Sequence, residues 1–243
     1  MEAAILIETR DEATFITLNR PEKANALSGE MADGIKLAIN DASEAGSRAV
    51  IIHGVGRHFC AGFDFGDFDR LTDGDLALRF IQVEEMLQTV FHAPMPVLAL
   101  VKGQAVGAGA DLAAAAMRVV AAPGTRFQMP GPRFGVVLGT RRLAYRIGNV
   151  STRQIQIENR AIETEEAEKL GLVDAIADPE SWDAVIDNFI VEYTRLSATV
   201  TAALSDVTRP DTRDADMAAL ARSVSIPGIK ERISAFRKST TRN

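Results

Sequence analysis

The sequence predicts an α/β fold with a helical C-terminal region, and three observations support this prediction. Strand-like runs alternate with helical periodicity over residues 5–176, and only helical patterns follow. The runs at 49–53 and 97–101 are apolar, as expected for strands covered on both faces of a sheet. No internal repeat or low-complexity segment interrupts this order. We therefore expect an α/β core over residues 1–190 and a helical region over residues 191–243.

Each predicted element has a local signal. Asp11 and Glu12 suit a hairpin turn, Ser28 is a preferred helix N-cap, and Thr164 is predicted to cap a helix that ends before Gly171. The predicted strands are 5–10, 13–19, 49–53, 97–101, 119–122 and 172–176. The predicted helices are 28–46, 75–91, 140–147, 151–158, 164–171, 181–196, 214–224 and 228–238. A further helix of small residues is predicted to end at 117. Residues 128–139 are expected to be irregular.

Composition excludes several classes of protein. The net charge of −6 argues against broad binding to nucleic acid or anionic membranes, although a few local cations could still hold a phosphorylated ligand. Cys60 is the single cysteine, so no intrachain disulfide can form. The N-terminus lacks the pattern of a secretory signal, and no run of about 18 apolar residues could span a membrane. We expect a cytoplasmic protein.

Residues 102–117, KGQAVGAGADLAAAAM, are predicted to join a glycine-containing loop to a helix of small residues. Glycine lets backbone approach a ligand, and a helix start exposes N–H groups at the positive end of its dipole. The stretch can therefore hold a developing negative charge, with Asp111 close by. A dinucleotide fingerprint is disfavoured because its third glycine falls on Leu112. An oxyanion hole for an acyl group and a packed helix start without chemistry both remain open.

Four stretches, in this order and spacing, resemble the enoyl-CoA hydratase/isomerase family, also called the crotonase family. They are LNRPEKANAL (18–27), FCAGFD (59–64), PVLALVKGQAVGAGAD (96–111) and AAPGTRF (121–127). The resemblance covers almost the whole chain, including residues 228–238. It implies a crotonase-like spiral core of ββα turns and C-terminal helices that build a homotrimer or a dimer of trimers. It also implies an acyl-CoA thioester as ligand, with coenzyme A present only as part of that substrate.

The resemblance implies roles for single residues as well. The backbone N–H groups of Phe63 and Ala108 would form an oxyanion hole, with Ala108 in a place where the family usually has glycine. Asp111 would be the catalytic carboxylate, at the position of the first of two glutamates that hydratases use. Contacts with coenzyme A would come from Lys23, Ala24, Asn25, Ala61, Asp64 and Phe65, and from Phe236 and Lys238 toward a neighbouring subunit.

The sequence departs from the family pattern where the second glutamate is expected. That position is Gly131, the loop after it is shortened to residues 138–142, and Met117 replaces a usual Asp. Syn addition of water needs one group to activate water and another to deliver a proton to the α-carbon. We therefore expect hydratase activity to be weak or absent.

Three hypotheses follow. The chain could be an enzyme of fatty-acid metabolism that uses Asp111 as its sole acid/base, as an isomerase or weak hydratase. It could be a non-catalytic acyl-CoA-binding protein. It could also hydrolyse a thioester or β-diketone, with a second group from Asp64, Asp67 or Glu84. Asp111 could instead cap its own helix, which would lower its pKa and favour the binding protein.

The remaining candidates have structural explanations. His53 is expected to be a satisfied core histidine, His58 an exposed loop residue, His92 a helix end and Cys60 a buried thiol. No cluster has metal-ligand spacing. Four arginines surround the altered loop and either attract a phosphate or acyl carboxylate or pair with acids in a trimer; they are Arg126, Arg133, Arg141 and Arg142.

Overall fold

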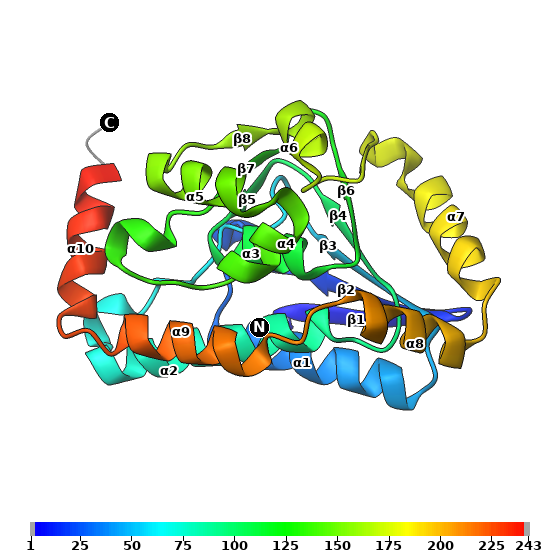
Figure 1. The fold of residues 1–243 in the computed structure, drawn as a ribbon, viewed down its shortest axis with the longest axis horizontal. Helices are drawn as coiled ribbons and strands as arrows, with labels where there is room; N and C mark the ends of the chain where they lie inside the picture. The colour runs from blue at the N-terminus through cyan, green and yellow to red at the C-terminus, as the bar shows by residue number, and fades with distance from the viewer. Residues whose placement is uncertain (1–2, 241–243) are drawn as a thin grey trace.

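The larger of two sheets forms the centre of the molecule (Figure 1). The computed structural model describes residues 3–240, without the side chain of residue 240. The strands lie in the order β1-β2-β3-β4-β6-β9, with β1 and β2 antiparallel and the other pairs parallel. Their bounds are β1 (Ile5–Arg10), β2 (Ala13–Leu18), β3 (Ala49–Gly54), β4 (Val97–Val101), β6 (Arg118–Ala121) and β9 (Ala175–Ile176). The predicted α/β class and hairpin are confirmed.

A second, three-stranded sheet was not expected from the sequence. It consists of β5 (Gln104–Val106), β7 (Arg126–Gln128) and β8 (Ile162–Glu163), in that order. Each strand has two or three residues, which is too short for the four to eight residues over which alternation identifies a strand. This sheet fixes the path of the loop before α3, because Gln104 pairs with Arg126 and Val106 with Gln128.

Helices α1 (Gly29–Glu44) and α2 (Asp73–Phe91) pack side by side below the larger sheet in Figure 1. The predicted Ser28 cap is confirmed, since its hydroxyl accepts a hydrogen bond from the N–H of Met31 at 3.2 Å. Helix α2 begins two residues before the predicted start. Thr72 and Asp75 form a reciprocal capping box there, which stabilises the extra residues.

The next helices are α3 (Ala108–Ala115), α4 (Thr140–Ile147), α5 (Asn149–Glu158) and α6 (Thr164–Leu170), and Gly171 ends α6 as predicted, at φ +86°. The predicted cap by Thr164 is wrong. Glu163 occupies the N-cap position, and Thr164 is the first helical residue. The Thr164 hydroxyl is buried and lies 3.0 Å from the carbonyl oxygens of both Ala122 and Thr125, so it ties α6 to the turn after β6.

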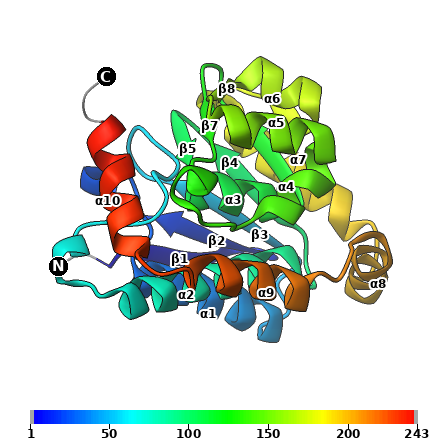
Figure 2. The same ribbon diagram turned by 60° about the vertical axis from the view of Figure 1, so that its left-hand side comes forward.

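The chain ends in α7 (Trp182–Thr194), α8 (Ala198–Thr208), α9 (Arg213–Val224) and α10 (Ile229–Thr240). Helix α8 was not predicted. Its fully buried positions include the polar Thr201 and Ser205, so it shows no clear apolar stripe. Helix α9 packs along α2, and α10 packs against α2 and the short 3₁₀ segment Gly131–Phe134 (Figure 2). Three other 3₁₀ segments are Pro21–Lys23, Phe68–Arg70 and Pro179–Ser181.

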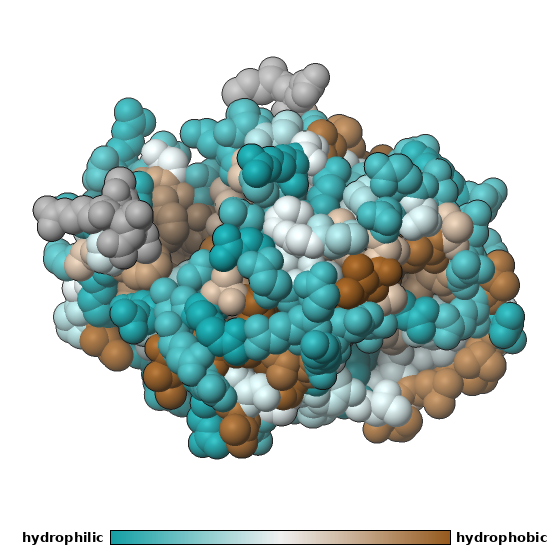
Figure 3. Space-filling model, turned by 90° about the horizontal axis from the view of Figure 1, so that it is seen from above, coloured by the Kyte–Doolittle hydropathy of each residue, from teal (hydrophilic) through white to brown (hydrophobic). Residues whose placement is uncertain are grey.

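Small side chains build the centre of the core. Every residue of α3 is buried, and its alanines pack among apolar residues of α1, α2 and the sheet. Apolar surface also remains outside, in separate patches among hydrophilic residues (Figure 3). Within residues 3–240, no helix combines the length and the apolar character needed to cross a membrane.

Candidate active site

The loop that contains Phe63 is held by two backbone hydrogen bonds that leave one N–H group free. The N–H of Leu27 donates to the carbonyl of Gly62 at 2.7 Å, and the N–H of Asp64 donates to the carbonyl of Leu27 at 2.9 Å. The N–H of Phe63, between these two bonds, has no acceptor among the described residues. A free N–H in an otherwise hydrogen-bonded loop is suited to hold a ligand oxygen.

The start of α3 provides a second free donor. Gly107 has φ +52° and donates its N–H to Gln128 at 2.7 Å, which turns the chain from β5 into the helix. Ala108 is the first helical residue, and within residues 3–240 its N–H has no acceptor. The first N–H groups of a helix have no partner in the helix itself and lie at the positive end of its dipole.

The two loops are in direct contact, so the two donors are neighbours. A Cβ at Gly62 would lie 3.4 Å from the amide nitrogen of Ala108 and would overlap the carbonyl of Val106. A Cβ at Gly109 would lie 2.8 Å from the Cβ of Cys60. Glycine at both positions is therefore required for the loops to approach this closely.

Phe63 and Ala108 both line a cavity of about 140 Å³, between the two loops, α3 and α10. Its walls are mostly apolar, and the rings of Phe63 and Phe80 stack with 4.4 Å between their centroids. The lining residues are Ala61, Phe63, Phe65, Phe80, Val106, Gly107, Ala108, Asp111, Met129, Pro130, Gly131, Pro132, Phe134, Val136, Leu138, Gln156 and Phe236. The structure thus brings together Phe63, Ala108 and Asp111, as the sequence predicted for one site.

Asp111 is the one ionisable side chain among these lining residues. It is 5% exposed, and burial raises its pKa to about 8, with the charge of Glu84 adding to that rise and the charge of Arg142 opposing it. Its carboxyl group accepts no hydrogen bond from the described residues of its own helix, where it stands one turn after the start. The capping alternative, with its lowered pKa, is therefore wrong.

Gly131, which the resemblance predicts at the position of the second glutamate, lies in the wall of the same cavity. It begins a 3₁₀ turn that α10 covers. A Cβ there would lie 3.0 Å from the carbonyl oxygen of Val136, so the backbone leaves little room for a side chain. The cavity therefore contains one proton-transfer group.

A buried ion-pair network lies behind Asp111, and sequence reasoning missed it. Arg142, 2% exposed, pairs with Glu84 of α2 and, at 3.2 Å, with Asp216 of α9. Asp216 also pairs with Arg141 at 2.9 Å. Gln88 donates to Glu84 at 2.9 Å, while the Nε of Arg142 is buried without a partner among the described residues. The signal available in the sequence was a glutamate within the otherwise apolar face of α2.

Three of the residues expected to contact coenzyme A line the cavity, namely Ala61, Phe65 and Phe236. Lys23 and Lys238 are exposed outside it, and Ala24 is partly exposed. The side chain of Asn25 is buried and occupied within the protein: it accepts from the N–H of Arg20 and donates to the carbonyls of Val55 and His58. The carboxylate of Asp64 pairs with Arg20 at 2.8 Å. The side chains of Asn25 and Asp64 are therefore both engaged within the protein and are not free for a ligand.

The arginines near the altered loop pair within the chain. Arg126 contacts Glu163 at 3.0 Å, and Arg141 and Arg142 share Asp216; no ion pair of Arg133 is seen in the described part of the chain. His53 has a hydrogen-bond partner, as expected, in the hydroxyl of Thr17 at 3.0 Å, but its side chain is partly exposed and not fully in the core.

The minor candidates are accounted for by their surroundings. His58 is only partly exposed, contrary to expectation, because the backbone at Gly103 lies against its ring. His92 ends α2, as expected. Burial raises the pKa of the Cys60 thiol to about 12, which leaves it unreactive. No group of three or more His, Cys, Asp or Glu residues within residues 3–240 is arranged to hold a metal ion.

Comparison with known proteins agrees with this geometry. Residues 8–227 match the family model described as enoyl-CoA hydratase/isomerase. A "probable enoyl-CoA hydratase" of Rhodobacter capsulatus is 36% identical over 189 residues, covering 75% of this chain and 69% of that protein. A crystal structure of an enoyl-CoA hydratase/isomerase family protein from Bordetella parapertussis superposes with a TM-score of 0.95 at 40% identity, covering 97% of this chain and 98% of the other. A second such structure, from Xanthobacter autotrophicus, gives 0.87 at 25% identity, covering 100% and 94%. The chain belongs to the enoyl-CoA hydratase/isomerase family.

Proposed function

We propose that this protein binds an acyl-CoA thioester and moves a proton at its α-carbon, with Asp111 as the sole acid/base. The N–H groups of Phe63 and Ala108 hold the thioester oxygen, on which the enolate charge develops. Such a donor contributes about 3 kcal/mol to the transition state. The observation that carries this proposal is the position of Asp111: a buried, unbonded carboxyl group in the same cavity as two N–H groups without acceptors.

One carboxyl group favours isomerisation over hydration. Moving a double bond requires a base that takes a proton from one carbon and returns it to another, which a single carboxylate can do. Hydration requires a second group to activate water, and Gly131 supplies none. The pKa of about 8 suits a group that must both accept and release a proton near neutral pH.

The size of the cavity supports a short acyl chain. Its volume of about 140 Å³ is close to the roughly 150 Å³ of an engineered apolar cavity that binds benzene. Phe80, Phe134 and Val136 supply apolar walls. Ala61, Phe65 and Phe236 would contact the pantetheine portion, and the exposed Lys23 and Lys238 would attract the phosphates of coenzyme A. The ligand contacts of Ala24 and Asn25 would come from their backbone.

We further propose that the chain assembles as a homotrimer or a dimer of trimers. Large apolar side chains are exposed on α5 and α8, which is unusual for the surface of a monomer. They are Val150, Ile157, Val200 and Val207. Sedimentation of the purified chain measures the assembly directly.

Acyl-CoA binding without catalysis is the second candidate, and the observation that favours it is the absence of an acid/base group at Gly131. The hydrolytic hypothesis loses its support. Asp64 pairs with Arg20, Glu84 pairs with Arg142, and neither of these carboxylates nor Asp67 lines the cavity.

The test compares binding and turnover in the native protein and in Asp111→Asn, an uncharged variant of the same shape. Calorimetry with butyryl-CoA measures binding, and absorbance of the conjugated product measures isomerisation of 3-hexenoyl-CoA. The proposal predicts that both proteins bind and that the variant is at least a hundredfold slower. Binding by both without turnover by either would establish the second candidate.

A further inference from the structure

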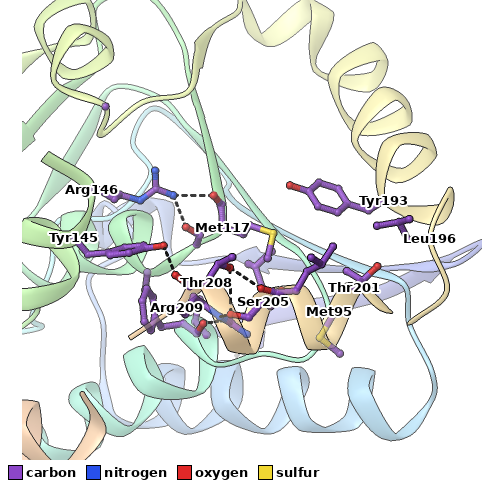
Figure 4. A pocket seen from close by; sticks show the side chains of 17 residues that line it. Met95, Met117, Tyr145, Arg146, Tyr193, Leu196, Thr201, Ser205, Thr208 and Arg209 are labelled. Atoms are coloured by element: carbon purple, nitrogen blue, oxygen red, sulfur yellow. Dashed lines mark hydrogen bonds between the residues drawn. The ribbon is translucent and has the colours of Figure 1, made fainter. Parts of the chain in front are cut away.

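A second cavity, of about 430 Å³, lies apart from the one that contains Asp111. It is enclosed by the C-terminal part of α2, the start of β4, the ends of α3 and α4, and helices α7 and α8 (Figure 4). The two cavities share no lining residue. The volume falls within the range of about 300–1,000 Å³ that is typical of small-molecule sites.

The lining of this cavity has two arginines at one end, and the rest is mostly apolar with hydroxyl groups from Tyr193, Thr201, Ser205 and Thr208. Arg146 and Arg209 line it, and its described wall includes no aspartate or glutamate. The hydroxyl of Tyr145 donates to the carbonyl of Thr208 at 3.0 Å, which joins α4 to the end of α8 and brings the two arginines to the same end. The apolar wall consists of Val90, Phe91, Met95, Val97, Ala115, Ala116, Met117, Leu196 and Leu204.

Among the described residues, Arg209 forms one long ion pair, with an exposed carboxylate. Its guanidinium donates to three backbone carbonyls, those of Ser205, Phe91 and Ala93. That carboxylate is Asp206, at 3.8 Å and largely exposed. A guanidinium has five N–H donors, so two remain for a ligand. Burial lowers the pKa of Arg209, as expected for a cation that is desolvated without a bound anion.

Arg146 adds charge but no free donor. It donates to the carbonyls of Ala114, Ala116, Met117 and Leu172, and it contacts Asp174 at 3.3 Å outside the cavity. Along α8, Thr201 lies eight residues before Arg209, about 12 Å away at the helical rise. The cavity therefore extends away from its cationic end over a distance that suits an extended aliphatic chain.

We propose that this cavity binds a monocarboxylate with an apolar chain, independently of the acyl-CoA site. The carboxylate accepts hydrogen bonds from the two free N–H groups of Arg209, and the charge of Arg146 contributes to its binding. The chain lies along Met117, Met95 and Leu204. The ligand supplies the negative charge that the described wall of the cavity lacks.

The test is calorimetric titration of the purified full chain with octanoate, and with octan-1-ol as an uncharged probe of the same length. The proposal predicts saturable octanoate binding with one molecule per chain, and affinity for octan-1-ol at least tenfold lower. Met117→Asp places a carboxylate in the cavity wall next to Arg146 and should lower octanoate affinity at least tenfold. Thr201→Val, a nearly isosteric change away from the cationic end, should change it less than twofold.

Two further variants separate this cavity from the acyl-CoA site. Leu204→Trp fills the second cavity and should abolish octanoate binding, while Leu138→Trp obstructs the first cavity and should leave that binding within twofold. Because the side chain of Leu204 is 49% exposed, a tryptophan there does not require the hydrophobic core to repack. The proposal is overturned if octanoate does not bind, if Leu138→Trp rather than Leu204→Trp abolishes binding, or if octan-1-ol binds as well as octanoate.

Discussion

The carboxyl group of Asp111 lies against the backbone of Gly139, so closely that a Cβ at Gly139 would overlap it and lie 2.8 Å from the Cβ of Asp111. Gly139 has φ +64° and precedes the first residue of α4. The glycine thus does two things: it permits a left-handed turn, and it leaves room for the carboxyl group.

Gly139→Ala is predicted to impair both stability and catalysis, because the new methyl group displaces Asp111. Gly124→Ala is the matched control, since Gly124 has φ +72° with no atom within 4 Å of a Cβ. The control should lose about 1–2 kcal/mol from left-handed strain alone. Urea unfolding and isomerase assays measure the difference; equal losses of stability and activity in the two variants would contradict a role for the contact.

Asp111→Asn is predicted to stabilise the protein, most strongly above pH 8. The native carboxyl has a pKa of about 8, raised by burial from 3.8, so the folded state holds a proton that the unfolded state releases between these values. Stability of the native protein therefore falls as the pH rises through that window and levels off above it. Thermal melts from pH 5 to pH 9 should show this slope in the native protein and not in the variant.

Glu84→Gln is predicted to lower the apparent pKa of catalysis. The negative charge of Glu84 raises the pKa of Asp111, and the positive charge of Arg142 lowers it. Removing the first charge therefore shifts the pH–rate profile toward acid. The variant should also lose about 3–5 kcal/mol, because Arg142 remains buried without its main partner. A pH–rate profile that is the same in both proteins would show that the ion-pair network affects folding alone.

Gly131→Glu is predicted to add hydration to the activity, since it introduces a second carboxyl group at the cavity wall. The Val136 carbonyl, 3.0 Å from the new Cβ, must shift slightly to accept it. Gly131→Gln has the same size but cannot transfer a proton. Hydration of crotonyl-CoA should rise at least tenfold in the glutamate variant relative to the glutamine variant, which absorbance at the enoyl band measures. Equal hydration rates in the two variants would show that a carboxyl group at position 131 does not activate water.

Much of this architecture was predictable because it depends on local patterns. Apolar runs at β3 and β4 and the cap at Ser28 predicted the correct class, and the six strands of the larger sheet were predicted in their correct chain order. The second sheet was not predicted, because its strands have only two or three residues and form only by pairing with segments that are distant in the sequence. Helix α8 escaped because its buried face includes polar residues.

The candidate site was predictable only in part. The resemblance to the family predicted one site from Phe63, Ala108 and Asp111, and all three line one cavity in the structure. The raised pKa of Asp111 was not predictable, because it depends on burial by α4 and on charges from α2. The ion pair of Arg142 with Asp216 joins residues that are 74 positions apart.

The central claim is that one carboxyl group, Asp111, both removes and returns the proton. The most direct test is isomerisation of 3-hexenoyl-CoA in D₂O, with deuterium in the product measured by mass spectrometry. A single buried base predicts that a measurable share of product retains the substrate hydrogen, and that Asp111→Asn abolishes turnover. Complete exchange with solvent, at a rate that the variant does not change, would contradict the claim.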